Sequence, residues 1–267
     1  MEVFEHNRMA WNRESLQGSD WARPVPAHVI QRARQGSWEV ILTPTRPVPR
    51  AWFGDIRNKR ILCLASGGGQ QAPVLAAGGA RVVSLDISEE QLAKDRMVAR
   101  REGLDLRCVQ GTMTDLSAFG DEAFDLVFNP VSTVFVPDPR PVWRESYRVL
   151  RPGGALLAGL MNPAFFLFDH DEARVEGTLV ARYPLPYSEK DLEPIPPARR
   201  RAIERGEARE FSHSLETLIG GQVDAGFVIS GFYEDGWSDE ATPLNRLCPT
   251  FMATLARRLR IRENDID

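Results

Sequence analysis

The sequence predicts an α/β fold: a Rossmann-like, doubly wound, mostly parallel sheet of seven strands, with an N-terminal helical leader and a lid insertion. Short apolar runs alternate with helical stretches between residues 60 and 161, and two further apolar runs close the chain. Nearly continuous apolar runs are typical of parallel strands that are covered on both faces. Strands that alternate with helices predict right-handed crossover connections.

Residues 1–54 are expected to form the leader, and residues 55–267 the main domain. Two short helices are predicted in the leader, near residues 3–16 and 27–35. The prolines of segment 43–49 predict irregular structure, because each one removes a backbone donor and restricts the preceding residue. Three leader tryptophans, Trp11, Trp21 and Trp38, either cover a ligand pocket or pack on the sheet.

The main domain follows the α/β alternation in order. Strands are expected at residues 60–65, 81–87, 106–110, 124–128 and 155–161, and helices at residues 70–77, 89–102 and 141–150. Ser88 is a good N-cap for the second helix, with Gln91 as its capping-box partner, and Gly103 ends that helix. Pro152 and the two glycines after it are expected to turn the third helix into the next strand.

Residues 162–212 break the alternation and are rich in aromatic residues, proline and charge. This segment is predicted to be a lid over the strand ends. A helix at 214–225 and strands at 228–233 and 250–256 complete the expected fold.

Composition limits the function classes. The chain has 267 residues, 43% of them hydrophobic and 26% charged, with a formal net charge of −4. This charge favours neither nucleic acid nor an anionic membrane as a partner. Three unpaired cysteines and no signal-peptide pattern predict a cytoplasmic protein, and the sequence leaves its oligomeric state open.

A glycine turn predicts the ligand site. Residues 61–72 form a strand, the run Ser66-Gly67-Gly68-Gly69 and a helix start. Glycines let a ligand approach the backbone, and the helix N-terminus offers free N–H groups. Asp86 ends the next strand, 19 residues after Gly67. At that spacing a carboxylate can accept the hydroxyls of a ribose, so the pattern predicts a nucleoside site.

Both NAD-binding and S-adenosylmethionine (SAM)-binding folds use this arrangement. The residues Gly67-x-Gly69-x-x-Ala72 also satisfy the dinucleotide fingerprint in its Gly/Ala form. The glycine turn and Asp86 alone therefore leave both cofactors open.

Several ordered motifs resemble the class I SAM-dependent methyltransferases over residues 55–160. The turn at 61–69 is similar to their first motif, with Cys63 and Ser66 in place of the usual acidic and glycine positions. Residues 109–116 resemble the adenine motif, with Thr112 in place of the usual Asp, and residues 124–130 resemble the fourth motif. Residues 148–154, Arg-Val-Leu-Arg-Pro-Gly-Gly, closely resemble a further signature of the family. The resemblance implies the cofactor SAM, bound by Ala65, Ser66, Gly67, Gly69, Gln70, Asp86, Ile87, Gln91, Gly111, Thr112, Met113, Asn129, Pro130 and Val131.

Residues 64–71, 129–138 and 231–237 extend the resemblance to a bacterial subgroup of uncharacterised methyltransferases. The implied activity is in-line methyl transfer to a small-molecule acceptor, driven mainly by proximity and desolvation. His213 is the best base candidate by its ordinary pKa, and Tyr187 and Tyr233 are candidates for orienting the acceptor. No metal site is expected. An NAD(P)-dependent oxidoreductase and a non-catalytic SAM-binding protein are the alternatives.

Overall fold

The computed structural model describes residues 2–188, 197–238 and 240–260. Its centre is one seven-stranded sheet in the order β3-β2-β1-β4-β5-β7-β6, in which only β7 runs antiparallel to its neighbours. The strands are β1 (Arg60–Leu64), β2 (Arg81–Asp86), β3 (Leu106–Gln110), β4 (Phe124–Asn129), β5 (Leu150–Met161), β6 (Val228–Asp235) and β7 (Phe251–Arg257). The predicted fold class is confirmed.

Helices cover both faces of the sheet. They are α1 (Glu2–Gln17), α2 (Ala27–Arg34), α3 (Arg50–Phe53), α4 (Gln71–Ala77), α5 (Glu89–Glu102), α6 (Arg140–Val149), α7 (His170–Glu176), α8 (Pro197–Arg205) and α9 (Gly221–Asp224). Within β1, Ile61 and Cys63 join the core shared with α2 and α4, whereas Leu62 and Leu64 join the core shared with α6. This two-residue alternation buries both faces of the strand. Among the described residues, no helix is long and apolar enough to cross a membrane.

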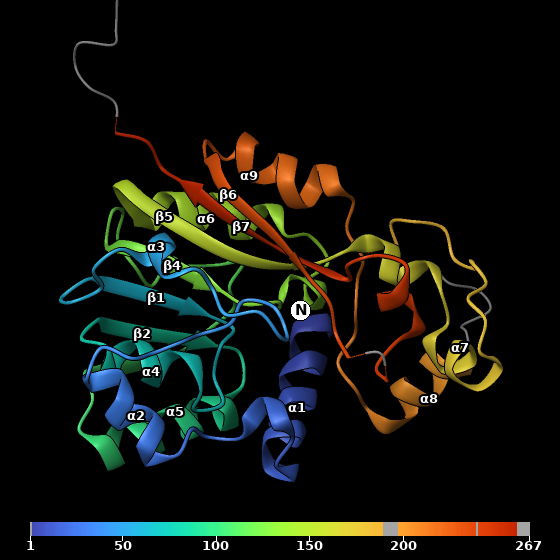
Figure 1. The fold of residues 1–267 in the computed structure, drawn as a ribbon, viewed down its shortest axis with the longest axis horizontal. Coiled ribbons are helices and arrows are strands. Elements are labelled where there is room, and N and C mark those ends of the chain that lie inside the picture. Colours follow the sequence, from blue (N-terminus) through green and yellow to red (C-terminus); the bar gives the residue numbers. More distant parts are fainter. Residues whose placement is uncertain (1, 189–196, 239, 261–267) are drawn as a thin grey trace, which may run out of the picture.

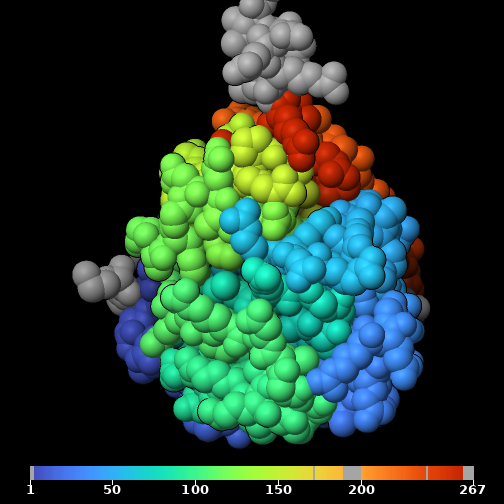
Figure 2. Space-filling model, turned by 90° about the vertical axis from the view of Figure 1, so that its left-hand side faces the viewer, coloured from blue at the N-terminus to red at the C-terminus, as the bar shows by residue number. Residues whose placement is uncertain are grey.

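The leader contributes side chains to the core and forms part of one end of the molecule. Ile30, Trp38, Leu42 and Phe53 pack into the same core as α4. Helix α1 stands at the end of the sheet toward which β1 and β2 point, and α7 and α8 lie on that side (Figure 1). At the opposite end, the blue leader segment lies beside the teal and green segments of the main domain (Figure 2). Residues 189–196 of the predicted lid lie outside the described residues.

The predicted N-cap and the predicted end of α5 are confirmed, but the capping box is not, because the N–H of Ser88 donates to the carboxylate of Asp86 and not to Gln91. The Ser88 hydroxyl accepts the backbone N–H of Gln91 at 3.1 Å, and Gly103 ends the helix with φ of 63°. A glycine there avoids the steric cost of the left-handed conformation.

The turn between α6 and β5 differs from the prediction. Helix α6 ends at Val149, before Pro152, and β5 begins at Leu150, earlier than the expected residue 155. Leu150 pairs with Phe124, and pairing then resumes between Ala155 and Leu126. The intervening residues 151–154 therefore form a bulge, and the glycines serve this bulge within the strand.

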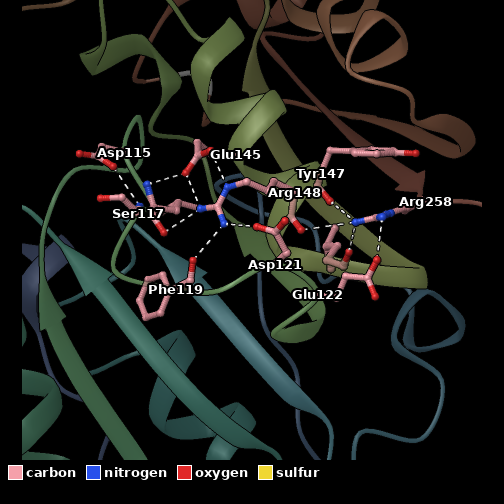
Figure 3. Close-up of polar contacts among 11 residues, drawn as sticks. Asp115, Ser117, Phe119, Asp121, Glu122, Glu145, Tyr147, Arg148 and Arg258 are labelled. Carbon is pink, nitrogen blue, oxygen red and sulfur yellow. Dashed lines mark hydrogen bonds and ion pairs between the residues drawn. The ribbon is translucent and has the colours of Figure 1, made fainter.

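Arg148, in the same signature, anchors the connection between β3 and β4 (Figure 3). Its guanidinium donates to the carbonyl oxygens of Leu116 and Phe119 at 2.9 and 3.0 Å. It also pairs with Glu145 and Asp121, each at 2.7 Å. The planar fork of arginine suits several acceptors at once. This part of the signature is therefore structural.

Two further segments depart from the expected elements. In place of one helix over 214–225, a π-helical turn (Glu216–Gly220) precedes α9, and Trp143 donates its indole N–H to the carbonyl of Thr217 at 3.1 Å. A side-chain hydrogen bond to a backbone carbonyl, such as this one, is compatible with the wider π-helical turn. Segment 43–49 is also more regular than expected, because Ile41 bridges Pro47 and Val48 donates to the carbonyl of Val40 at 3.0 Å.

Candidate cofactor and acceptor site

A cavity of about 440 Å³ opens at the carboxyl ends of β1, β2 and β4. Ligands of doubly wound sheets bind at this edge, and the volume lies in the range of small-molecule sites. Twelve of the fourteen predicted cofactor residues line it: Ala65, Ser66, Gly67, Gln70, Asp86, Ile87, Gln91, Gly111, Thr112, Met113, Pro130 and Val131. We call this part of the lining the cofactor half.

The first residue after β1 has an unusual backbone. Ala65 adopts φ of 45°, a conformation that favours glycine, and it donates its N–H to the carbonyl of Leu85 at 2.8 Å. Ala65 therefore occupies the glycine position of the first motif. The sequence analysis had assigned Ser66 to that position. At Gly67 a Cβ atom would lie 2.7 Å from Cβ of Gln91, so only glycine fits between β1 and α5.

Leader residues are in direct contact with the rest of the glycine turn. A Cβ at Gly68, where φ is 102°, would collide with the carbonyl oxygen of Trp21. Gly69 does not line the cavity, because it lies against Pro24 and its carbonyl accepts the N–H of Val25 at 2.9 Å. Gly69 is thus a leader contact in this structure, whereas the sequence analysis had placed it among the cofactor residues.

The two glutamines after the glycine run also hold the leader. The Gln70 amide donates to the carbonyl oxygens of Asp20 at 2.6 Å and Arg23 at 3.2 Å. Gln71 accepts the N–H of Ile41 at 3.0 Å. Together with the contacts of Gly68 and Gly69, these bonds fix the leader across the end of the turn.

Asp86 is positioned by backbone donors. Its carboxylate accepts the N–H of Gly67 at 3.1 Å and that of Ser88 at 2.8 Å. Burial raises the pKa of Asp86 to about 6, although these two hydrogen bonds oppose the shift. Each oxygen keeps acceptor capacity toward the cavity, as a ribose site requires.

Asp95, on α5, is a residue that the sequence analysis missed. Its carboxylate accepts the N–H of Gly69 at 2.8 Å, and burial raises the pKa of Asp95 to about 7. The available signal was a charged residue within the buried stripe Leu92, Asp95, Val98 and Ala99 of α5. Asp95 thus holds the glycine turn against α5.

The expected adenine segment lines the cavity next to Asp86. Gly111 donates its N–H to the carbonyl of Asp86 at 3.0 Å, and the Thr112 hydroxyl pairs with that of Thr114 at 2.8 Å. Asn129 is fully buried and lies outside the lining, because its amide donates to the Ser132 hydroxyl at 2.8 Å. In this structure Asn129 holds the loop after β4, whereas the sequence analysis had placed it among the cofactor residues.

One face of α1 forms a wall of the cavity. Phe4, Asn7, Trp11 and Glu14 line it at helical spacing. The Asn7 amide donates to the carbonyl of Phe135 at 3.0 Å, and its oxygen accepts the N–H of Arg209 at 2.8 Å. The sequence left a pocket role open for Trp11, whereas long-range bonds such as those of Asn7 cannot be recognised from sequence spacing.

Another part of the lining is rich in aromatic rings, and we call it the acceptor half. Trp11 meets Phe135 edge to face at 5.0 Å between ring centroids, and Trp237 lies 6.2 Å from Trp21 and 5.6 Å from Phe251. The acceptor half consists of Phe4, Asn7, Trp11, Val134, Phe135, Met161, Phe165, Glu207, Ala208, Glu210, Trp237 and Phe251. Leader residues Trp11 and Trp21 thus line the cavity, while Trp38 packs in the core.

The three predicted catalytic residues lie outside this lining. His213 is buried, it donates Nε2–H to the carbonyl of Thr133 at 3.0 Å, and burial lowers the pKa of its imidazole. Tyr187 stacks on Phe166 within the lid, at 5.3 Å. Tyr233 packs against Trp52 on the sheet, at 5.2 Å. None of the three side chains therefore belongs to the cavity lining of this structure.

Comparisons with known proteins match this geometry. Residues 62–158 match a family model described as a methyltransferase domain. Over 234 residues the chain is 49% identical to the uncharacterized methyltransferase YbaJ of Bacillus subtilis (strain 168), covering 87% of this chain and 91% of the relative. The chain belongs to the class I SAM-dependent methyltransferases. The enzyme therefore uses SAM, and neither the oxidoreductase nor the non-catalytic alternative applies.

Solved structures show the same fold for this methyltransferase. A S-adenosylmethionine dependent methyltransferase from Mesorhizobium loti has a TM-score of 0.61 at 21% identity, covering 78% of this chain and 95% of that one. The 1,6-didemethyltoxoflavin-N1-methyltransferase of Burkholderia thailandensis, solved with bound S-adenosylhomocysteine, has a TM-score of 0.58 at 15% identity, covering 97% and 90%.

Proposed function

We propose that this methyltransferase transfers the SAM methyl group to a small molecule that binds in the acceptor half. The observation that supports this proposal is the continuity of the cavity. One space is lined both by the glycine turn with Asp86 and by the aromatic side chains of α1, the lid and the segment after β6. A space of about 440 Å³ suits a small molecule rather than a macromolecule.

The residues of the cofactor half fit SAM. Asp86 accepts the ribose hydroxyls, the backbone around Gly67 leaves room for the amino-acid end, and Thr112 and Met113 lie at the adenine. SAM supplies an activated methyl group on a sulfonium. The protein contributes by holding the acceptor in line with that group and by excluding water.

The mechanism uses proximity and desolvation as its main source of rate. The rings of Trp11, Phe135 and Trp237 surround the acceptor with apolar surface. Such surroundings favour a transfer in which charge at sulfur is lost. His213 has no part in the proposed reaction, because its Nε2–H is bound to the carbonyl of Thr133.

A titration and a turnover assay test this proposal. We expect SAM and S-adenosylhomocysteine to bind with micromolar affinity in calorimetry and NADH not to bind. We also expect release of S-adenosylhomocysteine with members of a small-molecule panel. Binding of NADH alone, or turnover only with a protein or nucleic-acid acceptor, would contradict it.

A further inference from the structure

Helix α1 is bonded to the ribose end of the cofactor half through one side chain. The Oδ1 atom of Asn12 accepts the hydroxyl of Ser88 at 2.6 Å and the N–H of Glu90 at 3.4 Å. Ser88 is fully buried at the N-cap of α5, and its own N–H donates to the carboxylate of Asp86 at 2.8 Å. A single residue therefore separates Asn12 from the carboxylate proposed to accept the ribose hydroxyls.

The Ser88 hydroxyl needs the Asn12 oxygen to serve its helix. The first N–H groups of a helix have no partner within it, and Ser88 accepts that of Gln91 at 3.1 Å. The same hydroxyl donates its hydrogen to Asn12, which leaves a lone pair directed at Gln91. Without the Asn12 oxygen, a buried hydroxyl hydrogen would lose its acceptor, which is costly. Asn12 lies outside the lining that the described residues form, so its effect on the cofactor passes through Ser88 and Asp86.

The same helix also carries a wall of the acceptor half. Trp11 is the neighbour of Asn12 in the chain, lines the cavity and meets Phe135 edge to face at 5.0 Å. Asn7 donates to the carbonyl of Phe135 at 3.0 Å and accepts the N–H of Arg209 at 2.8 Å. At 1.5 Å of rise per residue, Asn7 and Asn12 lie about 8 Å apart along the axis. One short stretch of α1 thus has contacts to both halves.

Such an arrangement links the binding of two ligands. A ligand that binds one arrangement of a protein stabilises it, and a second ligand that needs the same arrangement then binds more tightly. The linkage is reciprocal, since each ligand changes the affinity for the other by the same factor. The shared arrangement here is α1, held by Asn12 toward the cofactor and by Asn7 toward the acceptor.

We propose that Asn12 is a positioning residue that couples the cofactor half to the acceptor half through α1. It sets Ser88 and Asp86 for the ribose, and the bound cofactor in turn stabilises α1 and the acceptor wall that α1 forms. SAM therefore raises the affinity of the enzyme for its acceptor. The inference rests on the proposed function, in which the acceptor binds against this wall.

Hydrogen exchange of the α1 amides, with and without saturating S-adenosylhomocysteine, tests the coupling in the full-length enzyme. We expect the ligand to slow this exchange about fivefold or more in the parent. In Asn12→Ala the gain should fall below about twofold, and the calorimetric affinity for the ligand should fall about fivefold, as for one hydrogen bond. The gain compares two states of one variant, so a merely structural loss of α1 stability cancels from it. Asn12→Asp keeps an acceptor at the same place and should keep the gain.

A second variant tests the route through Ser88. Ser88→Gly removes the hydroxyl at a position where glycine is a tolerated N-cap. Adding Asn12→Ala to it should change the affinity less than about twofold further, because the effects of two residues in one hydrogen-bond network are not additive. Gln17→Ala, at an exposed position of α1, is the control and should keep both the gain and the affinity.

The outcomes separate this inference from the proposed function. A full gain in folded Asn12→Ala, a lost gain in Asn12→Asp or Gln17→Ala, or additive effects with Ser88→Gly overturns the coupling through Asn12. If S-adenosylhomocysteine fails to bind the parent, the proposed function fails. If it binds and the exchange of α1 is unchanged, only this inference fails.

Discussion

The cofactor half and the acceptor half of the cavity are built in different ways. The cofactor half comes from one continuous part of the chain, residues 65–131, and much of it consists of backbone held by short-range turns. The acceptor half combines α1, the loop after β4, the lid and the segment between β6 and β7. Its walls are side chains that meet only through long-range contacts such as Asn7 with Arg209.

Because of this difference, the two halves tolerate different kinds of substitution. In the cofactor half, a single added Cβ displaces backbone, because Gly67 and Gly68 lie against α5 and the leader. In the acceptor half, a changed side chain alters the shape or charge of a wall and leaves the strand ends in place. We therefore expect the largest effects on SAM binding from the glycine turn and the most selective effects on the acceptor from its walls.

The largest effect is expected from Gly68→Ala. The new Cβ would collide with the carbonyl of Trp21 at a φ of 102°, so the leader has to leave the turn. We expect a loss of about 3 kcal/mol or more in SAM binding, from strain and overpacking together. Calorimetry measures this loss. Gly103→Ala is the matched control, since it also has positive φ but no atom within 4 Å of its Cβ, and it should bind SAM normally.

Asp86→Ala is expected to weaken SAM binding by about 1–3 kcal/mol, because charged hydrogen bonds to the ribose are lost. A pH series sharpens this prediction. The pKa of Asp86 is about 6, so the charged form is depleted below that pH and the affinity of the parent enzyme should fall there. The variant should lack this dependence. Unchanged affinity in a folded variant would place the ribose elsewhere.

Arg148→Lys tests the structural signature outside both halves. A lysine cannot serve the carbonyls of Leu116 and Phe119 and two carboxylates at once. We expect the free energy of unfolding to fall by about 1–3 kcal/mol, with SAM affinity unchanged. Denaturant unfolding and calorimetry measure the two quantities. Arg144→Lys, at an exposed position of the same helix, should change neither.

The smallest effect on SAM binding is expected from Asp95→Asn, because the amide oxygen can still accept the N–H of Gly69. Burial raises the pKa of Asp95 to about 7, so the folded protein holds a proton that the unfolded chain releases above about pH 4. The parent therefore loses stability as pH rises from about 4 to 7, and the variant does not. We expect the unfolding free energy of the variant relative to the parent to rise by up to about 4 kcal/mol between pH 4 and pH 8. A pH-independent difference in unfolding free energy would contradict this account.

The sheet and the cofactor half could be predicted because their signals are local. Strand periodicity, the glycine run and the spacing to Asp86 are visible within 30 residues of one another. The roles of Ala65 and Asp95 were missed for different reasons. The role of Ala65 depends on its backbone angle φ. The role of Asp95 depends on how α5 packs against the glycine turn.

Beyond the lid and a possible pocket role for Trp11, the acceptor half could not be predicted, because residues far apart in the chain form it. Asn7 and Arg209 are separated by 202 positions, and no pattern in either segment indicates the other. The surroundings of the base candidate could not be predicted for a related reason. His213 was chosen by its ordinary pKa, whereas its surroundings bury it against the carbonyl of Thr133.

The reversed strand β7 has a consequence for how such enzymes diversify. Because β7 runs opposite to β5 and β6, Asp235 pairs with Phe251 at the carboxyl edge, and the chain between them is a hairpin loop. That loop brings Trp237 to the cavity. A parallel strand would have needed a crossover and would have sent this connection to the far end of the sheet. One inverted strand thus provides a loop whose length and composition can vary at the reacting edge without any change in strand order.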